Sequence, residues 1–341
     1  MAEYTKPWLS LDEQLEKLQS RGVNIGDRNP CLALLQAVGY YRLTGYLYPF
    51  RESETYLDAS DRQRVRVLNF YREGTSIAEA AALIDFDRQL RLLVLDGMER
   101  IEVSLRMQVG YVLGKRSAFA HLDPATFQAS FVSIPADTPS ANGIAVAAAE
   151  PTPPGQAKSK HDLWLQRVLE RQDNSNEDFV AHFREKYDNR MPIWALTEIM
   201  EMGHLSRLYS GLNRELSTAV AEAYDVPSKR VLASWVSSLN YVRNVSAHHA
   251  RLFNRKLQVA PARPKIGDIP LLDHLHSAEI PKAFGVYNAL AVMAYLLRSI
   301  DGGRGWSHKV VELVSGFPES QNMTAAAIGV PPKWIELELW R

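Results

Sequence analysis

The chain has 341 residues, of which 46 % are hydrophobic, enough for a sizeable core and for two subdomains of ordinary size. Its 39 basic and 39 acidic side chains cancel, which excludes a general polyanion binder, so any affinity for nucleic acid must come from a local patch. The single cysteine, Cys31, excludes an internal disulfide and a cysteine-rich zinc site, and it suits a reducing cytoplasm.

The sequence predicts neither a targeting segment nor a membrane span. The first residues, MAEYTKPWLSLDEQL, lack a basic segment followed by an apolar one, as a signal peptide would have. The most apolar stretch, at 283–297, is too short to cross a membrane and is typical of a buried helix. We therefore expect a cytoplasmic protein that does not enter a membrane.

Helical signals open the chain. Ser10 and Glu13 stand three positions apart at the start of 10–22, which is the pattern of a capping box, and a short helix is expected from residue 29. An aromatic stretch follows, and its interruptions favour a turn or a hairpin-like loop. The interrupting residues are Gly39, Gly45 and Pro49.

The middle of the chain combines long helical patterns with one irregular segment. Apolar residues at three- and four-residue steps predict one or two long helices over about 76–114, with Gly97 tolerated inside them. Residues 133–160 are rich in Ala, Pro, Ser and Gly and predict a flexible loop or linker. Helical patterns resume at 160–172, 176–187, 192–212, 215–224, 228–253, 283–300 and 307–317. Strand-like alternation is scarce, so the predicted fold class is mainly α.

The stretch YVRNVSAHHARLFNR, at 241–255, holds two histidines and three arginines without an acidic residue. If 229–255 is one helix and Asn244 is set to zero, His248 lies near 40° at about 100° per residue. Arg251 and Arg255 then lie near about 340° and 20°, on the same polar stripe, while the apolar residues face the opposite side.

The second histidine occupies a different position on this helical wheel. His249 lies near about 140°, on the flank of the apolar face, so we expect the two histidines to have different roles. Arg243 lies about 100° from the stripe, but its long side chain can lean toward it.

The same region is locally basic. No Asp or Glu interrupts the eight Lys and Arg residues between 226 and 267, which is the footprint expected for phosphate. A histidine can take the proton of a ribose 2′-OH or protonate the leaving 5′-oxygen. An arginine can stabilise phosphoryl charge, and Asn244 can orient His248 or hold a phosphate oxygen. The pattern is compatible with phosphodiester cleavage without a metal, and the alternative is a solvated basic helix face with a chance histidine.

Most of 6–255 resembles a known family. RNVSAH, at 243–248, resembles the Arg-(four to six residues)-His motif of HEPN ribonucleases, in which Asn often follows the Arg. The surrounding WVSSLNYVRNVSAHHARLFNR is similar to the end of the Abi family, the bacterial abortive-infection proteins of the AbiD and AbiF type. The run GYYRLTGY resembles part of that family's opening, and FDRQLRLLVLDGMERIEVSLR and DFVAHFREKYDNRMPIWALTEIMEMGHLSRLY resemble its middle blocks.

This resemblance implies a HEPN-like helical bundle whose active site forms where two copies of the motif meet, so we expect a homodimer. It implies a ribonuclease site made of Arg243, Asn244 and His248, and RNA cleavage that halts growth of a phage-infected cell. We assign RNA binding to the basic residues that follow, which are Arg251, Arg255 and Lys256.

The expected organisation follows from the patterns and the resemblance together. An N-terminal helical and aromatic extension packs on the core, and the Ala/Pro-rich insertion departs from the family pattern. The expected units are 1–75 (N-terminal region), 76–132 (first part of the core), 133–160 (linker or loop), 161–320 (HEPN-like part with the RNVSAH motif) and 321–341 (C-terminal tail).

Other candidate residues have structural interpretations that we favour. Arg116 and His121 repeat the Arg-x4-His spacing, and we expect a loop there, with a second site as the alternative. Glu102 and Arg106 are four apart and can pair along a helix surface. The tyrosines of VGYYRLTGY can stack on bases, but tyrosines between glycines more often close a small core.

No metal or cofactor is expected. The remaining histidines stand singly or in DHLH, and neither a His-x3-His pattern nor a Walker-type loop occurs. The leading hypothesis is a metal-independent endoribonuclease acting in phage defence. The alternatives are a non-catalytic protein that holds a small structured or non-coding RNA, and a helical protein-interaction module. A toxic ribonuclease needs restraint, so an antitoxin or a non-coding RNA regulator is an expected partner.

Overall fold

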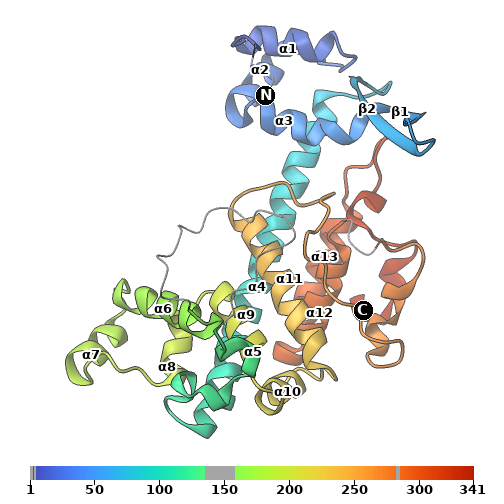
Figure 1. The fold of residues 1–341 in the computed structure, drawn as a ribbon. Helices are drawn as coiled ribbons and strands as arrows, with labels where there is room; N and C mark the ends of the chain where they lie inside the picture. Colours follow the sequence, from blue (N-terminus) through green and yellow to red (C-terminus); the bar gives the residue numbers. More distant parts are fainter. Residues whose placement is uncertain (1–2, 4, 135–157, 282–284) are drawn as a thin grey trace.

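The longest element is one helix that runs through the molecule (Figure 1). The computed structural model describes residues 3, 5–134, 158–281 and 285–341, and α4 (Ile77–Arg116) is a single helix of 40 residues within them. Ser76 begins it with a capping box closed by Glu79. At ~1.5 Å per residue α4 is about 60 Å long. The predicted linker at 133–160 falls mostly on 135–157, which lie outside the described residues.

The N-terminal region contains three short helices. The capping box of Ser10 and Glu13 is confirmed at the start of α1 (Leu11–Gln19). Gly39, with φ 78°, separates α2 (Arg28–Val38) from α3 (Tyr40–Leu47). The turn or hairpin-like loop predicted for this aromatic stretch is wrong over 40–47, because its apolar residues recur at helical spacing and form a buried face. The buried residues are Leu43, Tyr46 and Leu47.

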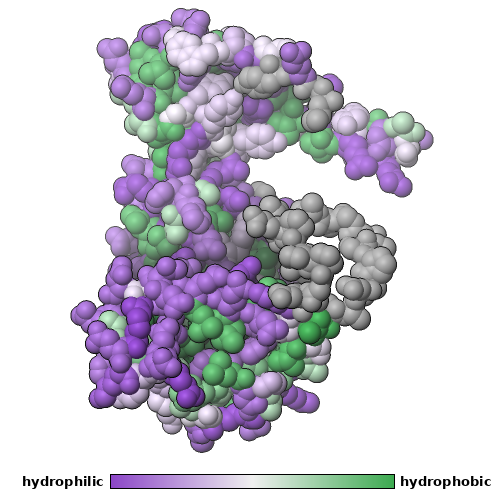
Figure 2. Space-filling view, turned by 60° about the vertical axis from the view of Figure 1, so that its left-hand side comes forward, coloured by the Kyte–Doolittle hydropathy of each residue, from purple (hydrophilic) through white to green (hydrophobic). Residues whose placement is uncertain are grey.

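A hairpin that the sequence did not predict follows α3. Its strands are β1 (Arg51–Leu57) and β2 (Gln63–Tyr71), paired antiparallel, and nearly every residue in them is exposed. Figure 2 shows this arm projecting from the N-terminal region. Ion pairs across the arm join Arg66 to Glu54, and Arg64 to Asp58 at 2.9 Å. Residues 64–67 alternate charged and apolar side chains. Both faces of the arm nevertheless carry polar side chains, so the pattern does not indicate one buried face.

The remaining helices confirm the mainly α fold class. One expected helix, at 192–212, is split, because Met200 adopts an extended conformation and Glu201 caps a new start. The helices are α5 (Ala129–Val132), α6 (Lys160–Asp173), α7 (Asp178–Lys186), α8 (Ile193–Leu196), α9 (Met202–Gly211), α10 (Arg214–Glu222), α11 (Lys229–Ala247), α12 (Tyr287–Asp301) and α13 (Arg304–Ser315). Short 3-10 turns lie at 48–50, 120–122, 124–126, 197–199, 270–276, 325–328, 334–336 and 338–340.

The core lies around α4. Helices α11, α12 and α13 pack along it, and α12 is buried on nearly all sides, as its apolar sequence predicted. Gly97 permits the close approach of the C-terminal part, because a Cβ there would lie 2.7 Å from Nε1 of Trp306. Among the described residues, no helix combines the length and the apolarity that a membrane crossing requires.

Candidate active site

The RNVSAH motif lies at the C-terminal end of α11. The helix ends at Ala247, not at residue 255 as the helical wheel assumed. His248 is the C-cap, and His249 takes the left-handed conformation with φ 57°. The amides of His249 and Ala250 donate to the carbonyls of Ser246 (3.1 Å) and Val245 (3.0 Å). These two bonds form a Schellman motif, with a histidine where glycine is most common.

This ending changes the arrangement predicted for the polar residues. Arg243 and Asn244 remain on α11, but Arg251 and Arg255 follow the turn, so the single helical stripe is wrong for them. The side chains of His248 and His249 are both exposed, and the predicted position of His249 beside an apolar face is also wrong. Two neighbouring histidines therefore differ by backbone conformation, not by helix face.

The three basic residues after the turn have different surroundings. Arg251 is half-buried and donates to the carbonyl oxygen of Gly45, and burial lowers the pKa of its guanidinium. Arg255 donates from Nε to the hydroxyl of Tyr241 at 2.8 Å. Lys256 is exposed. Their assignment to RNA binding stays a prediction.

A buried carboxylate holds the turn in place. Asp87 on α4 is 0 % exposed and accepts the amide of Phe253 at 2.8 Å and that of Leu252 at 3.1 Å. The hydroxyl of Tyr46 donates to it at 2.6 Å, and the guanidinium of Arg91 forms an ion pair with it. Burial raises the pKa of Tyr46 to about 12, with the Asp87 charge as a second cause, so its hydroxyl keeps its proton. The chain beyond His249 is thus fixed from α4.

The helix α3 adds two further contacts to the same turn. Arg42 donates from Nη1 to the carbonyl oxygen of His249 at 2.7 Å, and the carbonyl of Gly45 accepts from Arg251. Tyr46, from the same run, lies stacked on Phe253 with ring centroids 5.9 Å apart. The run GYYRLTGY therefore supports the turn after α11 through both hydrogen bonds and ring packing.

Arg243 faces α4. Its Nε lies 3.9 Å from Oε2 of Glu102, and its Nη1 donates to Oδ1 of Asn244 at 3.2 Å. Glu102 also accepts from Arg106 at 2.7 Å, which confirms the pair expected along α4. The three charged side chains border a pocket of about 320 Å³. Glu102 thereby orients the motif arginine while leaving much of its guanidinium open.

The second Arg-x4-His pair does not form a comparable site. Arg116 pairs with Asp123 at 3.2 Å, whereas His121 is buried in a 3-10 turn. Burial, with the nearby His161 charge, lowers the pKa of His121 to about 4. Arg116 and His121 therefore have contacts that stabilise the fold, and they lie near the opposite end of α4 from Asp87.

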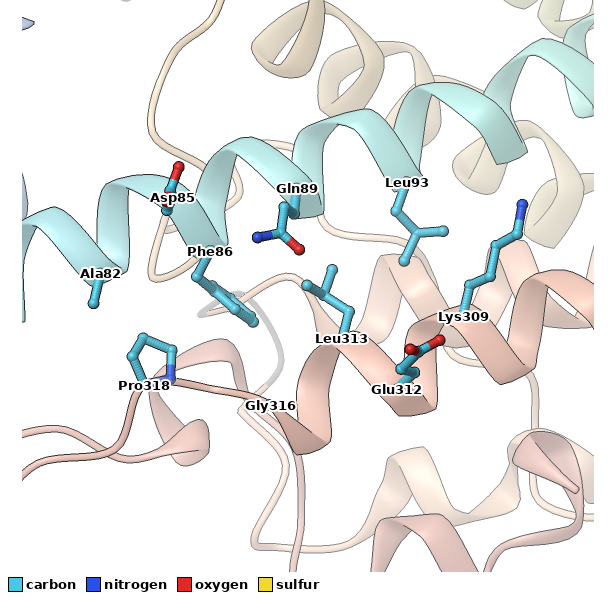
Figure 3. A pocket seen from close by; sticks show the side chains of 10 residues that line it. All are labelled: Ala82, Asp85, Phe86, Gln89, Leu93, Lys309, Glu312, Leu313, Gly316 and Pro318. Atoms are coloured by element: carbon cyan, nitrogen blue, oxygen red, sulfur yellow. The ribbon is translucent and has the colours of Figure 1, made fainter.

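Another pocket lies elsewhere on α4. It has a volume of about 590 Å³ and opens between α4 and α13 (Figure 3). Asp85 and Gln89 lie on one side of it and Lys309 and Glu312 on the other. None of Arg243, Asn244 and His248 lines it. In the described part of the chain, no group of three or more His, Cys, Asp or Glu residues has an arrangement that would hold a metal ion.

The sequence did not reveal the supporting residues as such. Asp87, Arg91 and Glu102 are charged residues inside the apolar pattern of α4, two of them four positions apart. The sequence signal that could have identified them is a charged residue on a helix face otherwise made of apolar residues. Such a charge, once buried, must be paired or hydrogen-bonded.

Comparison with known proteins gives one result. A family model described as Abi-like protein matches residues 33–254, and no curated protein or solved structure matches the chain. The matched region extends from α2 to the turn held by Asp87, so it includes Tyr46, Glu102 and the RNVSAH motif. Abi-like proteins are associated with abortive infection, a defence against phage. Because the match covers more than half of its length, the chain belongs to the Abi-like protein family.

Proposed function

We propose that this protein is a metal-independent endoribonuclease of the HEPN type that acts in phage defence. The observation that carries the proposal is the C-terminal end of α11. There His248 is exposed next to a turn whose backbone amides are bound by Asp87. A catalytic side chain needs a rigid support and access to substrate, and this corner supplies both. Family membership supports the defence role.

The chemistry assigned to the motif uses three groups. His248 takes the proton of the ribose 2′-OH, and the oxygen attacks the adjacent phosphorus while the P–O5′ bond breaks. The products are a 2′,3′-cyclic phosphate and a 5′-OH end, whose proton comes from a second acid. Arg243 stabilises the charge on the phosphoryl oxygens, and Asn244 holds either that guanidinium or a phosphate oxygen. Arg251, Arg255 and Lys256 are assigned to the flanking backbone of the RNA.

A homodimer would supply the second acid from the partner's copy of the motif. An exposed apolar stripe on α4 supports this assignment, since it lies beside the pocket that Arg243 borders. The stripe consists of Val103, Met107 and Tyr111, which are 49, 52 and 68 % exposed and recur every four residues on one face of α4. Leu92, 55 % exposed, lies on the same face beyond the ion pair of Asp96 and Arg100. An isologous pairing of α4 helices would cover these side chains and bring two motifs to one cleft.

Restraint by an antitoxin or a non-coding RNA in the cytoplasm completes the proposal. A ribonuclease that halts growth must be held inactive until infection. The basic turn after α11 is the surface that such an inhibitor would have to cover.

The test is cleavage of mixed RNA by purified protein in the presence of EDTA. We expect products with 2′,3′-cyclic phosphate ends, no cleavage by His248→Ala at an unchanged melting temperature, and full cleavage by the control His308→Ala, an exposed histidine on α13. Binding without cleavage would support a non-catalytic RNA-binding protein instead. If the protein neither binds nor cleaves RNA, a protein-interaction module becomes the better explanation.

The dimer is tested separately by sedimentation. Met107→Glu/Tyr111→Glu should give monomers without cleavage activity, while Leu169→Glu, which alters an exposed leucine on α6, should leave both properties intact. A wild-type monomer that cleaves RNA would contradict the dimer.

A further inference from the structure

A second basic site lies along α11 from the motif. A pocket of about 420 Å³ is lined by α6 and α9, and α11 contributes Ser237 to it. None of its lining residues belongs to the RNVSAH motif or to the turn that follows it. The pocket is therefore separate from the proposed active site.

All charged side chains that line this pocket are cations, namely Lys160, Arg167 and Arg207. Within the described ranges, none of the three has a carboxylate oxygen within ion-pair distance, and the nearby Glu201 pairs with Arg171 at 3.8 Å. Partial burial of the guanidinium, together with the charge of Arg167, holds the pKa of Arg207 below its usual value. The two guanidinium groups repel each other, and a bound anion would relieve this repulsion.

Besides apolar side chains, the pocket contains neutral hydrogen-bond donors. Four serine hydroxyls line it, and none of them makes a side-chain hydrogen bond to another described residue. A set of cations and free hydroxyls without a carboxylate suits phosphate oxygens, which accept several charge-assisted hydrogen bonds at once. The serines are Ser130, Ser206, Ser210 and Ser237.

The pocket and the motif share one face of α11. Ser237 precedes His248 by eleven residues, a rotation of about 20° beyond whole turns and a rise of about 16 Å. Asn244 lies between them on the same face. At the ~3.4 Å rise of a stacked strand this separation corresponds to about five nucleotides.

We propose that this pocket binds a backbone phosphate of the RNA strand whose cleavage takes place at His248, several nucleotides away. The assignment to RNA rests on the proposed ribonuclease function, whereas the preference for phosphate rests on the pocket alone. The pocket therefore sets the minimum length of a tightly bound RNA.

The first test uses inorganic phosphate at constant ionic strength. The melting temperature of the wild-type protein should rise with phosphate concentration, and that of Arg167→Gln/Arg207→Gln should not. Both arginines are exposed, so the double variant should fold. The control Arg171→Gln removes a neighbouring cation that is already paired, and it should respond as the wild type does. No response in the wild type, or an equal response in the double variant, would overturn the phosphate site.

The second test measures RNA binding in a non-cleaving His248→Ala background with fluorescein-labelled oligouridylates. The double substitution should weaken binding of a 16-mer at least tenfold and leave a tetramer, too short to span both sites, within twofold. The slope of the salt dependence for the 16-mer should decrease by about 0.7 for each RNA phosphate that the double variant no longer neutralises. Equal weakening of both lengths, or of neither, would refute the remote subsite.

The two tests separate the two proposals. If the wild type responds to phosphate but neither binds nor cleaves RNA, the proposed function fails and the pocket remains an anion site for another phosphorylated ligand. If the wild type cleaves RNA and the double variant binds the 16-mer normally, the function stands and the subsite is wrong.

Discussion

Replacing Asp87 by Asn tests whether the turn after α11 depends on a buried carboxylate. The substitution keeps the size of the side chain and removes its charge. One oxygen remains an acceptor, while the other becomes an NH2 group that faces donors, namely the amides of Leu252 and Phe253 or the hydroxyl of Tyr46. Arg91, only 6 % exposed, loses its counter-charge.

The expected loss of stability follows from these contacts. Breaking a buried ion pair by removing one partner costs about 3–5 kcal/mol, and a hydrogen bond to a charged group contributes about 1.5–3 kcal/mol. Asn preserves part of the second contribution, so we expect the free energy of unfolding to fall by about 4 kcal/mol. Tyr46→Phe removes the donor to Asp87 and an acceptor for Arg91 at 3.3 Å, and it should cost about 1.5–3 kcal/mol.

The assay is urea unfolding combined with RNA cleavage measured well below the transition. Asp85→Asn is the matched control, because Asp85 lies about half a turn away on α4, is 70 % exposed and pairs, among the described residues, with Arg88 alone. It should change stability by less than about 0.5 kcal/mol. Cleavage by folded Asp87→Asn should also fall, since His248 would lose the anchored turn beside it. A loss below about 1 kcal/mol, or an equal loss in the control, would refute the assigned role of Asp87.

Three further predictions concern other described residues. His249→Gly should raise stability by about 1 kcal/mol, because glycine takes φ 57° without strain, whereas His249→Ala should lower it slightly; equilibrium unfolding of both checks this, and a stabilised Ala variant would contradict it. His121 has a folded pKa of about 4, below its ordinary value of 6.5, so its contribution is present above pH 6.5 and is lost as pH falls toward 4. Between pH 6.5 and 4 the free energy of unfolding should decrease by about 3 kcal/mol, and His121→Gln should abolish this decrease. An unchanged pH dependence of the unfolding free energy in that variant would contradict the assignment. Gly97→Ala should destabilise by about 1–3 kcal/mol through contact with Trp306, while Gly45→Ala, with nothing within 4 Å, should not destabilise; thermal melts that rank them in the reverse order would disprove the packing argument.

The sequence predicted the helices where periodicity alone decides the structure. Ser10 and Ser76 begin α1 and α4 through local capping bonds, which need no information from distant residues. The end of α11 was not predictable in this way. Nothing between 241 and 255 is a glycine or proline, and the helix ends because His249 accepts a left-handed conformation while Asp87, distant in sequence, binds the amides beyond it.

In the candidate site, too, local patterns were predictable and contacts between distant segments were not. Residues 243–248 were identified from spacing and resemblance, but the surroundings of Arg243 required the packing of α11 against α4. Glu102 was expected to pair with Arg106 only, and its position 3.9 Å from Arg243 comes from the crossing of two helices. The hairpin was missed because its strands bury almost nothing, so the short alternation of charged and apolar residues at 64–67 does not distinguish a buried face from a solvent face.

The continuous helix α4 limits where this protein can tolerate changes in length. Inserting one residue within it would rotate everything beyond the insertion by about 100° and advance it by ~1.5 Å. The contacts made by α4 before the insertion and those made after it could then not all form in the same structure. These contacts include Asp87 with the turn at 252–253, Gly97 with Trp306, Glu102 with Arg243, and Gly110 with Trp194. Relatives of this chain should therefore keep the fifteen-residue interval between Asp87 and Glu102 constant and vary in length in their loops.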